Sequence, residues 1–136
     1  MSAADVEILA RMWEEFAGSG PSTDFAGFVE RWWHPDLVYE EDPRWPGAAT
    51  YEGRDDARAA FEGYREVLGD PELSVERVVE AGGRIVALVR FVGRSPGADV
   101  PWDHVWGYDC RIRDGKLIHL RAYWDPQEAL EPAGGA

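Results

Sequence analysis

The chain has 136 residues, of which 45% are hydrophobic and 12% aromatic, so it can form the core of one domain and is not a disordered segment. Its 26 acidic and 14 basic residues give a net charge of −12, which argues against binding to nucleic acids or anionic membranes. Cys110 is the only cysteine, so we expect no intrachain disulfide and a cytoplasmic location. We also expect neither a secretion signal nor a membrane-spanning segment.

Three stretches have the periodicity of amphipathic helices. In each of them apolar residues recur at steps of three and four and form one apolar stripe. The predicted helices cover Ala4–Ala17, Asp24–His34 and Arg54–Leu68. We expect Gly18, Pro35 and Gly69 to end them, because glycine favours a helix C-terminus and proline disfavours helix at the preceding residue.

Most of the remaining chain is typical of β-strands. Runs of β-branched and aromatic residues are joined by Gly82-Gly83 and by Asp114-Gly115, which are tight-turn sequences. The predicted strands cover Leu37–Asp42, Leu73–Ala81, Arg84–Arg94, Val100–Arg113 and Lys116–Trp124. We expect Pro43–Thr50 to form a loop and Pro126–Leu130 to form one closing helical turn.

This order of elements predicts an α+β fold in which helices lie on one face of a curved sheet. Residues 1–136 are expected to form a single domain, with 131–136 as a frayed tail. A sheet that wraps around helices leaves a concave hollow open at one end. Because such hollows are common sites for small molecules, the fold itself points to a ligand pocket.

Several short motifs follow one another in an order that is known from one protein family. Glu41-Asp42-Pro43 follows the first predicted strand, Gly53-Arg54 opens the third helix, and Arg113–Leu117 forms a hairpin. The segments Leu120–Trp124 and Glu128–Leu130 add to the likeness. Over nearly its whole length the chain resembles the SnoaL-like polyketide cyclases and ketosteroid isomerases of the nuclear-transport-factor-2-like superfamily.

The resemblance implies a cone-shaped half-barrel, in which a curved, mostly antiparallel sheet wraps around N-terminal helices and encloses a pocket. It also implies a homodimer through the outer face of the sheet, a hydrophobic small-molecule substrate or ligand, and neither a metal nor an organic cofactor. It does not fix a reaction, because this fold hosts isomerases, cyclases, epoxide hydrolases, dehydratases and non-catalytic binders.

Asp42 is the strongest candidate for a catalytic residue. It ends a strand, precedes Pro43 and matches the position at which ketosteroid isomerases carry the aspartate that shuttles a proton. A carboxylate at the mouth of a hydrophobic pocket suits a general base that works near neutral pH. The alternative is a turn aspartate whose side chain accepts hydrogen bonds from its own backbone.

The predicted strand Val100–Arg113 carries further candidates, and two registers compete for it. Read locally, Pro101–His104 resembles the isomerase segment that holds a protonated aspartate, which would give that role to Asp103. Counting back from the Asp114-Gly115 turn instead places Tyr108, and not Asp103, at the strand position that carries a functional residue in the family.

Alternation of side chains along this strand favours one face. The more apolar face carries His104, Trp106, Tyr108, Cys110 and Ile112. We therefore expect His104 and Tyr108 to point into the pocket, with Asp103 as a third candidate. A bulge near Gly107 would reverse the faces on one side of it.

One position departs from the ketosteroid isomerase pattern, and at another the direction of the side chain is undecided. The tyrosine that the first helix of those enzymes supplies falls near Met12, whose side chain cannot donate a hydrogen bond. Arg90 would pair with Asp42 or His104 if it pointed inward, and would belong to the dimer surface if it pointed outward.

Large aromatic residues are candidates for contact with a ligand. The residues expected to bind the substrate are Trp45, Tyr64, Trp106 and Trp124. Trp45 is the strongest of them, because it lies in the loop after Asp42. The alternative is that most of these rings fill the barrel and a dimer interface.

The sequence is therefore compatible with two functions of different classes. An enzyme of the isomerase, cyclase or lyase type would remove a proton next to a carbonyl group, with Asp42 or His104 as the base and Tyr108 as the donor to the enolate oxygen. A non-catalytic ligand-binding or dimerisation domain would use the same fold without a complete catalytic set.

Overall fold

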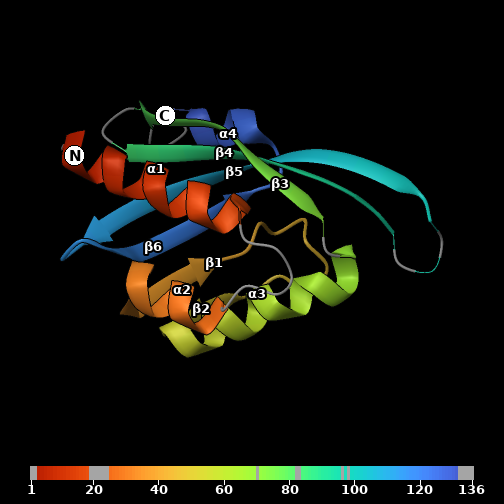
Figure 1. Ribbon diagram of the computed structural model, residues 1–136, viewed down its shortest axis with the longest axis horizontal. Helices are drawn as coiled ribbons and strands as arrows, with labels where there is room; N and C mark the ends of the chain where they lie inside the picture. Colours follow the sequence, from red (N-terminus) through yellow and green to blue (C-terminus); the bar gives the residue numbers. More distant parts are fainter. Residues whose placement is uncertain are drawn as a thin grey trace.

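The computed structural model describes residues 3–18, 25–69, 71–81, 84–95, 97 and 99–131. Within these residues the chain forms four helices and one six-stranded sheet (Figure 1). The helices are α1 (Ala3–Gly18), α2 (Phe25–Trp32), α3 (Arg54–Leu68) and α4 (Pro126–Leu130). The strands are β1 (Trp33–Glu40), β2 (Thr50–Glu52), β3 (Glu72–Ala81), β4 (Arg84–Arg94), β5 (Pro101–Arg113) and β6 (Lys116–Tyr123). The predicted α+β class is confirmed.

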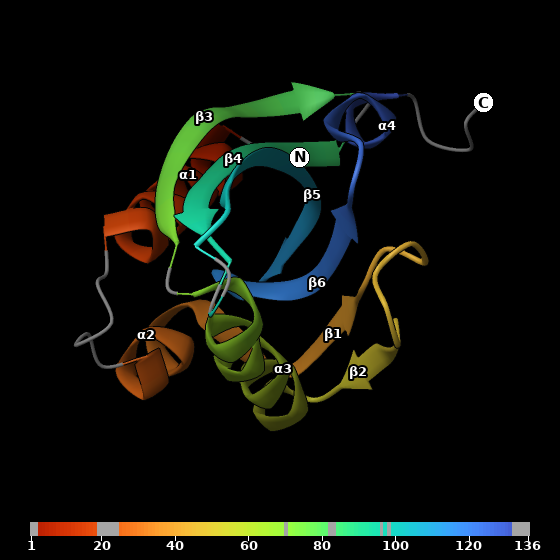
Figure 2. The ribbon, with the colours of Figure 1, turned by 90° about the vertical axis from the view of Figure 1, so that its right-hand side faces the viewer.

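The sheet has the strand order β2-β1-β6-β5-β4-β3 and curls strongly without closing (Figure 2). β1 and β6 run parallel, whereas all other neighbouring strands run antiparallel, so the sheet is mostly antiparallel as predicted. Asp114 and Gly115 join β5 to β6 with positive φ angles of 53° and 76°, the backbone conformation that a two-residue type I′ hairpin requires.

Several predicted boundaries were wrong. The first strand, predicted over Leu37–Asp42, begins at Trp33 and ends at Glu40, so Asp42 follows the strand instead of ending it. The second helix ends at Trp32 instead of His34, because Trp33 already pairs with Leu117 of β6 and its indole is buried in the core. The predicted loop Pro43–Thr50 runs into a short strand, β2, which pairs with the end of β1. The Gly82-Gly83 turn and the tail from residue 132 onward lie outside the described residues.

Helices α1, α2 and α3 cover the concave face of the sheet, and the main core lies between them. Trp13 of α1 stacks on Tyr108 of β5 with ring centroids 4.7 Å apart. Phe61 of α3 packs edge-on against Trp33 of β1 with centroids 5.1 Å apart. Because these rings are almost fully buried, the helices and the sheet are held together mainly by the hydrophobic effect.

The alternation predicted for β5 is confirmed. Trp106, Tyr108 and Cys110 belong to the core on the concave face. The ladder between β4 and β5 runs without a register shift from Ile85–Cys110 to Arg94–Pro101, so no bulge occurs near Gly107.

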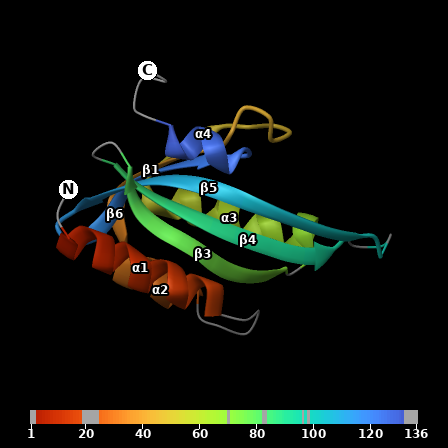
Figure 3. The same ribbon diagram turned by 90° about the horizontal axis from the view of Figure 1, so that it is seen from above.

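Helix α4 lies on the opposite, convex face of the sheet (Figure 3). Its Ala129 packs against Val86 and Leu88 of β4. A Cβ atom built on Gly107 would lie only 2.6 Å from the Cβ of Ala129, so the close approach of α4 to β5 requires glycine at this position.

We expect Gly107→Ala to destabilise the protein by about 1–3 kcal/mol, because α4 must shift to make room for the added methyl group. Gly63→Ala is the matched control, because a Cβ at this exposed position of α3 meets nothing within 4 Å. It should stabilise the helix by about 0.5–1 kcal/mol. Urea denaturation measures both changes, and equal effects of the two substitutions would contradict the packing described for α4.

Candidate functional site

A pocket opens on the concave side of the sheet, where β1 ends. It is lined by Tyr39, Glu41, Asp42, Trp45, Tyr64, Leu68, Phe91, Trp106 and Tyr108. Its free space for water is about 20 Å³, which is enough for one ordered molecule. A larger ligand must therefore displace a side chain, and Trp45 is a candidate because it is only partly buried and belongs to the exposed loop that follows Asp42.

Local structure explains why these groups meet. In β1, alternation points Leu37 and Tyr39 into the core, and Glu41 continues this series just after the strand ends. Tyr64 reaches the same place from α3, on the same side of the helix as Phe61. β1, α3 and β5 thus each contribute polar groups to one mostly aromatic pocket.

Glu41 is the centre of a buried hydrogen-bond chain. Its side chain accepts a hydrogen bond from the Tyr64 hydroxyl and another, 3.0 Å long, from the backbone N–H of Ala49. The hydroxyl oxygens of Tyr39 and Tyr64 are 2.7 Å apart. Because Tyr64 donates to Glu41, Tyr39 must be the donor to Tyr64. Glu41 is 9% exposed, and no basic side chain in the described part of the chain forms an ion pair with it.

The phenol groups of the pocket stay protonated at neutral pH. Burial raises the pKa of Tyr39, and it raises the pKa of Tyr64 together with the negative charges of neighbouring groups and the bond to Glu41. Burial also raises the pKa of Tyr108 well above its usual range. Among the described residues, the Tyr108 hydroxyl forms no hydrogen bond, so it can donate to an oxygen atom of a ligand.

These raised pKa values predict a loss of stability at high pH. Above about pH 10 the tyrosines of the unfolded chain lose protons that the folded chain retains, so the free energy of unfolding falls as the pH rises. We expect alkaline unfolding, followed by circular dichroism, to coincide with phenolate absorbance, and Tyr108→Phe to make the fall with pH shallower. Ionisation of Tyr39, Tyr64 and Tyr108 near pH 10 in a folded protein would contradict this.

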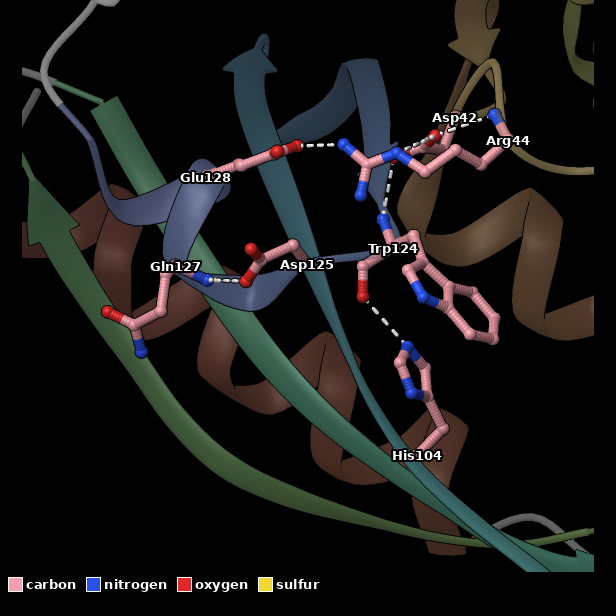
Figure 4. Close-up of polar contacts among 7 residues, drawn as sticks. All are labelled: Asp42, Arg44, His104, Trp124, Asp125, Gln127 and Glu128. Carbon is pink, nitrogen blue, oxygen red and sulfur yellow. Dashed lines mark hydrogen bonds and ion pairs between the residues drawn. The ribbon is translucent and has the colours of Figure 1, made fainter.

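Asp42 is buried and connects two parts of the chain (Figure 4). Its Oδ1 accepts a hydrogen bond of 2.8 Å from the backbone N–H of Arg44, and its Oδ2 accepts one of 2.7 Å from the backbone N–H of Trp124. Arg44 also lies 3.5 Å from Oδ1 through its Nε and forms an ion pair with Glu128 of α4. The carboxylate therefore joins the end of β1 to the end of β6.

We expect Asp42→Asn to destabilise the fold by about 1–3 kcal/mol, because an amide offers only one acceptor oxygen and one backbone N–H loses its partner. Urea denaturation measures this change. Asp36→Asn is the control, because the Asp36 side chain is 86% exposed. An unchanged stability of Asp42→Asn would show that the two hydrogen bonds contribute nothing.

His104 and Trp124 do not line the pocket, although both were candidates. His104 stacks on Trp124 with ring centroids 3.7 Å apart, and its Nε2 donates a hydrogen bond of 2.7 Å to the Trp124 carbonyl oxygen (Figure 4). Trp106, which does line the pocket, meets the Trp124 ring at 90°. Alternation places His104 on the same face of β5 as Trp106 and Tyr108. His104 lies nearer the start of the strand than these two residues, however, and does not line the pocket.

Asp103 and Arg90 point away from the pocket. They form a bidentate ion pair on the convex face of the sheet, with Nε and Oδ1 2.8 Å apart. This pair lowers the pKa of Asp103, so the carboxylate stays ionised and cannot serve as the protonated donor of the isomerase pattern. Met12 is buried in the core, as its place in the apolar face of α1 requires.

The residues that sequence reasoning missed are Glu41 and Tyr39. Both could have been found by extending the alternation of β1 by one step, because Leu37, Tyr39 and Glu41 share a face. Within the described residues no group of His, Cys, Asp or Glu side chains is placed to hold a metal ion. None of the described helices is long and apolar enough to cross a membrane.

Comparisons with known proteins agree with this architecture. A family model for the SnoaL-like domain matches residues 9–120. A candidate SnoaL-like polyketide cyclase from Jannaschia sp. CCS1 has a TM-score of 0.73 and 19% identity, over 97% of this chain and 92% of that one. TerC, co-crystallised with polyporic acid, has a TM-score of 0.71 and 17% identity, over 91% and 93% of the two chains.

A third solved structure has a ketosteroid isomerase-like fold and contains trimethylamine. This protein, from Catenulispora acidiphila DSM 44928, has a TM-score of 0.65 and 16% identity, over 98% of this chain and 95% of that one. No curated protein sequence matches the chain significantly. The structural likenesses show a shared fold, and the family model covers most of the sequence. The chain therefore belongs to the SnoaL-like domain family and has the nuclear-transport-factor-2-like fold.

Proposed function

We propose that the protein is an enzyme of the isomerase, cyclase or lyase type, which removes a proton next to a carbonyl group of a small hydrophobic substrate. One observation carries this proposal. Glu41 is a buried carboxylate without a cationic partner among the described residues, it is linked to Tyr64 and Tyr39, and it lies in an aromatic pocket. Buried titratable groups that converge in a cleft are typical of catalytic sites.

Glu41 is the general base in this proposal, in place of Asp42. Both carboxylates accept at least two hydrogen bonds, so these do not distinguish them. Proton uptake by Asp42 would also weaken its contact with Arg44, whereas Glu41 forms no ion pair with a described residue. Asp42 then acts as a positioning residue that holds the end of β1, and thereby Glu41, against the end of β6.

The oxygen of the substrate carbonyl gains negative charge when the neighbouring carbon loses its proton. Tyr108 lines the same pocket, and its hydroxyl is proposed to donate a hydrogen bond to this oxygen, which stabilises the charge in a site from which water is largely excluded. Tyr64 and Tyr39 keep the Glu41 carboxylate oriented toward the pocket. These two tyrosines supply hydroxyl groups that Met12 of α1 cannot supply.

Exchange of carbon-bound hydrogen tests the proposal without knowledge of the natural product. Acetone, cyclopentanone and 1-indanone are incubated with the protein in D₂O, and deuterium uptake beside the carbonyl is followed by NMR. We expect protein-dependent exchange for at least one ketone, and Tyr108→Phe should slow it about 10-fold or more. Uptake at the buffer rate for every ketone would contradict the proposal.

A non-catalytic binding domain is the second candidate, and the narrowness of the pocket favours it. With free space for about one water molecule, the pocket holds a larger ligand only after a lining side chain moves. Such a domain would be stabilised against heat by its ligand, while the ligand would be recovered chemically unchanged. Deuterium uptake that depends on Glu41 would exclude this candidate.

We also propose that the protein forms a homodimer through the convex face of the sheet. Helix α4 covers part of this face, and Val92 of β4 is 40% exposed beside the covered part. An exposed apolar residue next to the Arg90–Asp103 pair is consistent with a partly polar interface. Light scattering coupled to gel filtration should give twice the mass of one chain, and Val92→Glu should reduce it to one.

A further inference from the structure

We propose that the pocket holds a small organic cation, specifically an alkylated ammonium group carried by the substrate. This inference deepens the proposed function, because it assigns a chemical class to one group of the molecule that the same pocket binds. It is carried by the distribution of charge around the pocket and by the arrangement of the rings that line it.

The charge of the pocket is negative and only partly balanced. Among the residues that the structure describes, two carboxylates line it, Glu41 and Asp42, and no lysine or arginine does. Arg44 balances Asp42 from the side of the loop, but the partners that the described residues offer to Glu41 are uncharged hydroxyl and amide groups. A buried carboxylate without a counter-ion gains more from a cationic ligand than from a neutral one, and it opposes an anionic ligand.

Aromatic rings form the walls beside these carboxylates. The ring of Trp45 lies 5.5 Å from that of Tyr64 at 77°, and 6.0 Å from that of Trp106 at 63°. At such angles the edge of one ring meets the face of the other. Their faces carry negative partial charge, and a cation within about 6 Å of several of them is attracted by each.

The residues that line the pocket favour an alkylated ammonium group over a bare ammonium or guanidinium group. A bare ammonium or guanidinium group needs several acceptor atoms when it leaves water, and the acceptor oxygens of Glu41 and Asp42 already receive hydrogen bonds. An alkylated ammonium group has few N–H donors to satisfy and presents methyl groups to the rings. The net charge of −12 of the whole chain also favours the approach of cations.

Choline and its uncharged isostere 3,3-dimethylbutan-1-ol form the decisive pair of probes, because they differ in one central atom and its charge. Titration calorimetry on the full chain at low ionic strength measures both affinities. We expect choline to bind at least about tenfold more tightly than the isostere. Glu41→Gln should weaken choline binding about tenfold, whereas Glu40→Gln should leave it unchanged, because Glu40 bonds to His119 outside the pocket.

Trp106→Leu should also weaken choline binding at least about fivefold, because it removes one of the rings that attract the cation. The proposal is overturned if choline does not bind, if the isostere binds equally well, or if Glu40→Gln weakens binding as much as Glu41→Gln. The comparison of the two probes uses the unmodified protein, so a variant that fails to fold leaves the test intact. Binding is measured without turnover. A protein that binds choline more tightly than the isostere but does not exchange ketone hydrogen would support this inference and contradict the proposed reaction.

Discussion

Glu41→Gln should reduce deuterium exchange on ketone substrates by about 100-fold or more while the protein stays folded. General acid–base residues typically contribute factors of 10² to 10⁴ to rates. The amide oxygen of glutamine can still accept the hydrogen bond from Tyr64, whereas the Ala49 N–H loses its acceptor. The basic group is therefore removed at a cost in stability of about 1–3 kcal/mol. The rate is measured by NMR in D₂O, and the fold by circular dichroism on the same samples.

Glu40→Gln is the matched control for this result. It removes the same charge from the neighbouring residue, whose side chain bonds to His119 instead of lining the pocket. We expect the exchange rate of this variant to equal that of the unmodified protein. If Glu41→Gln keeps the full rate and Asp42→Asn loses it at unchanged stability, then Asp42 is the base and our assignment is wrong.

Arg84→Met should destabilise the fold by about 3–5 kcal/mol. Arg84 and Asp109 are 8% and 7% exposed and form a buried ion pair with Nη1 and Oδ2 3.0 Å apart. Arg84 also donates to the carbonyl oxygen of Glu131 at the end of α4. Removing the guanidinium leaves the Asp109 carboxylate buried without its counter-ion, which is among the costliest single changes in a protein.

Arg90→Met is the control, because Arg90 lies on the same strand and the same face of the sheet and also pairs with an aspartate of β5. The side chains of this second pair are 46% and 47% exposed, so solvent screens their attraction and the urea midpoint should hardly change. Equal losses for Arg84→Met and Arg90→Met would contradict the role given to burial.

Much of the fold follows from local sequence patterns. The helix predicted over Arg54–Leu68 has those limits in the structure, because its apolar stripe is regular and Gly69 follows it. The end of α2 and the strand β2 could not be predicted in this way. Both depend on pairing within the sheet: Trp33 with Leu117 of β6, and Thr50–Glu52 with β1.

The candidate site was predictable in part, for a similar reason. Alternation along β5 identifies the face that carries Tyr108 and Trp106, and both line the pocket. It cannot show how far along the strand the pocket extends, which is why His104 was expected there. Glu41 was not predicted, because the resemblance to ketosteroid isomerases points to Asp42, the residue before Pro43.

In the proposed reaction, the pocket stabilises the anion formed when a ketone loses a proton. A crystal structure with 2-naphthol, a planar mimic of such an enolate, tests this most directly. We predict that its oxygen lies within hydrogen-bond distance of the Tyr108 hydroxyl, that its rings lie between Trp45 and Trp106, and that Trp45 has moved outward. Naphthol bound only outside this pocket, or inside it with its oxygen turned away from Tyr108, would contradict the account.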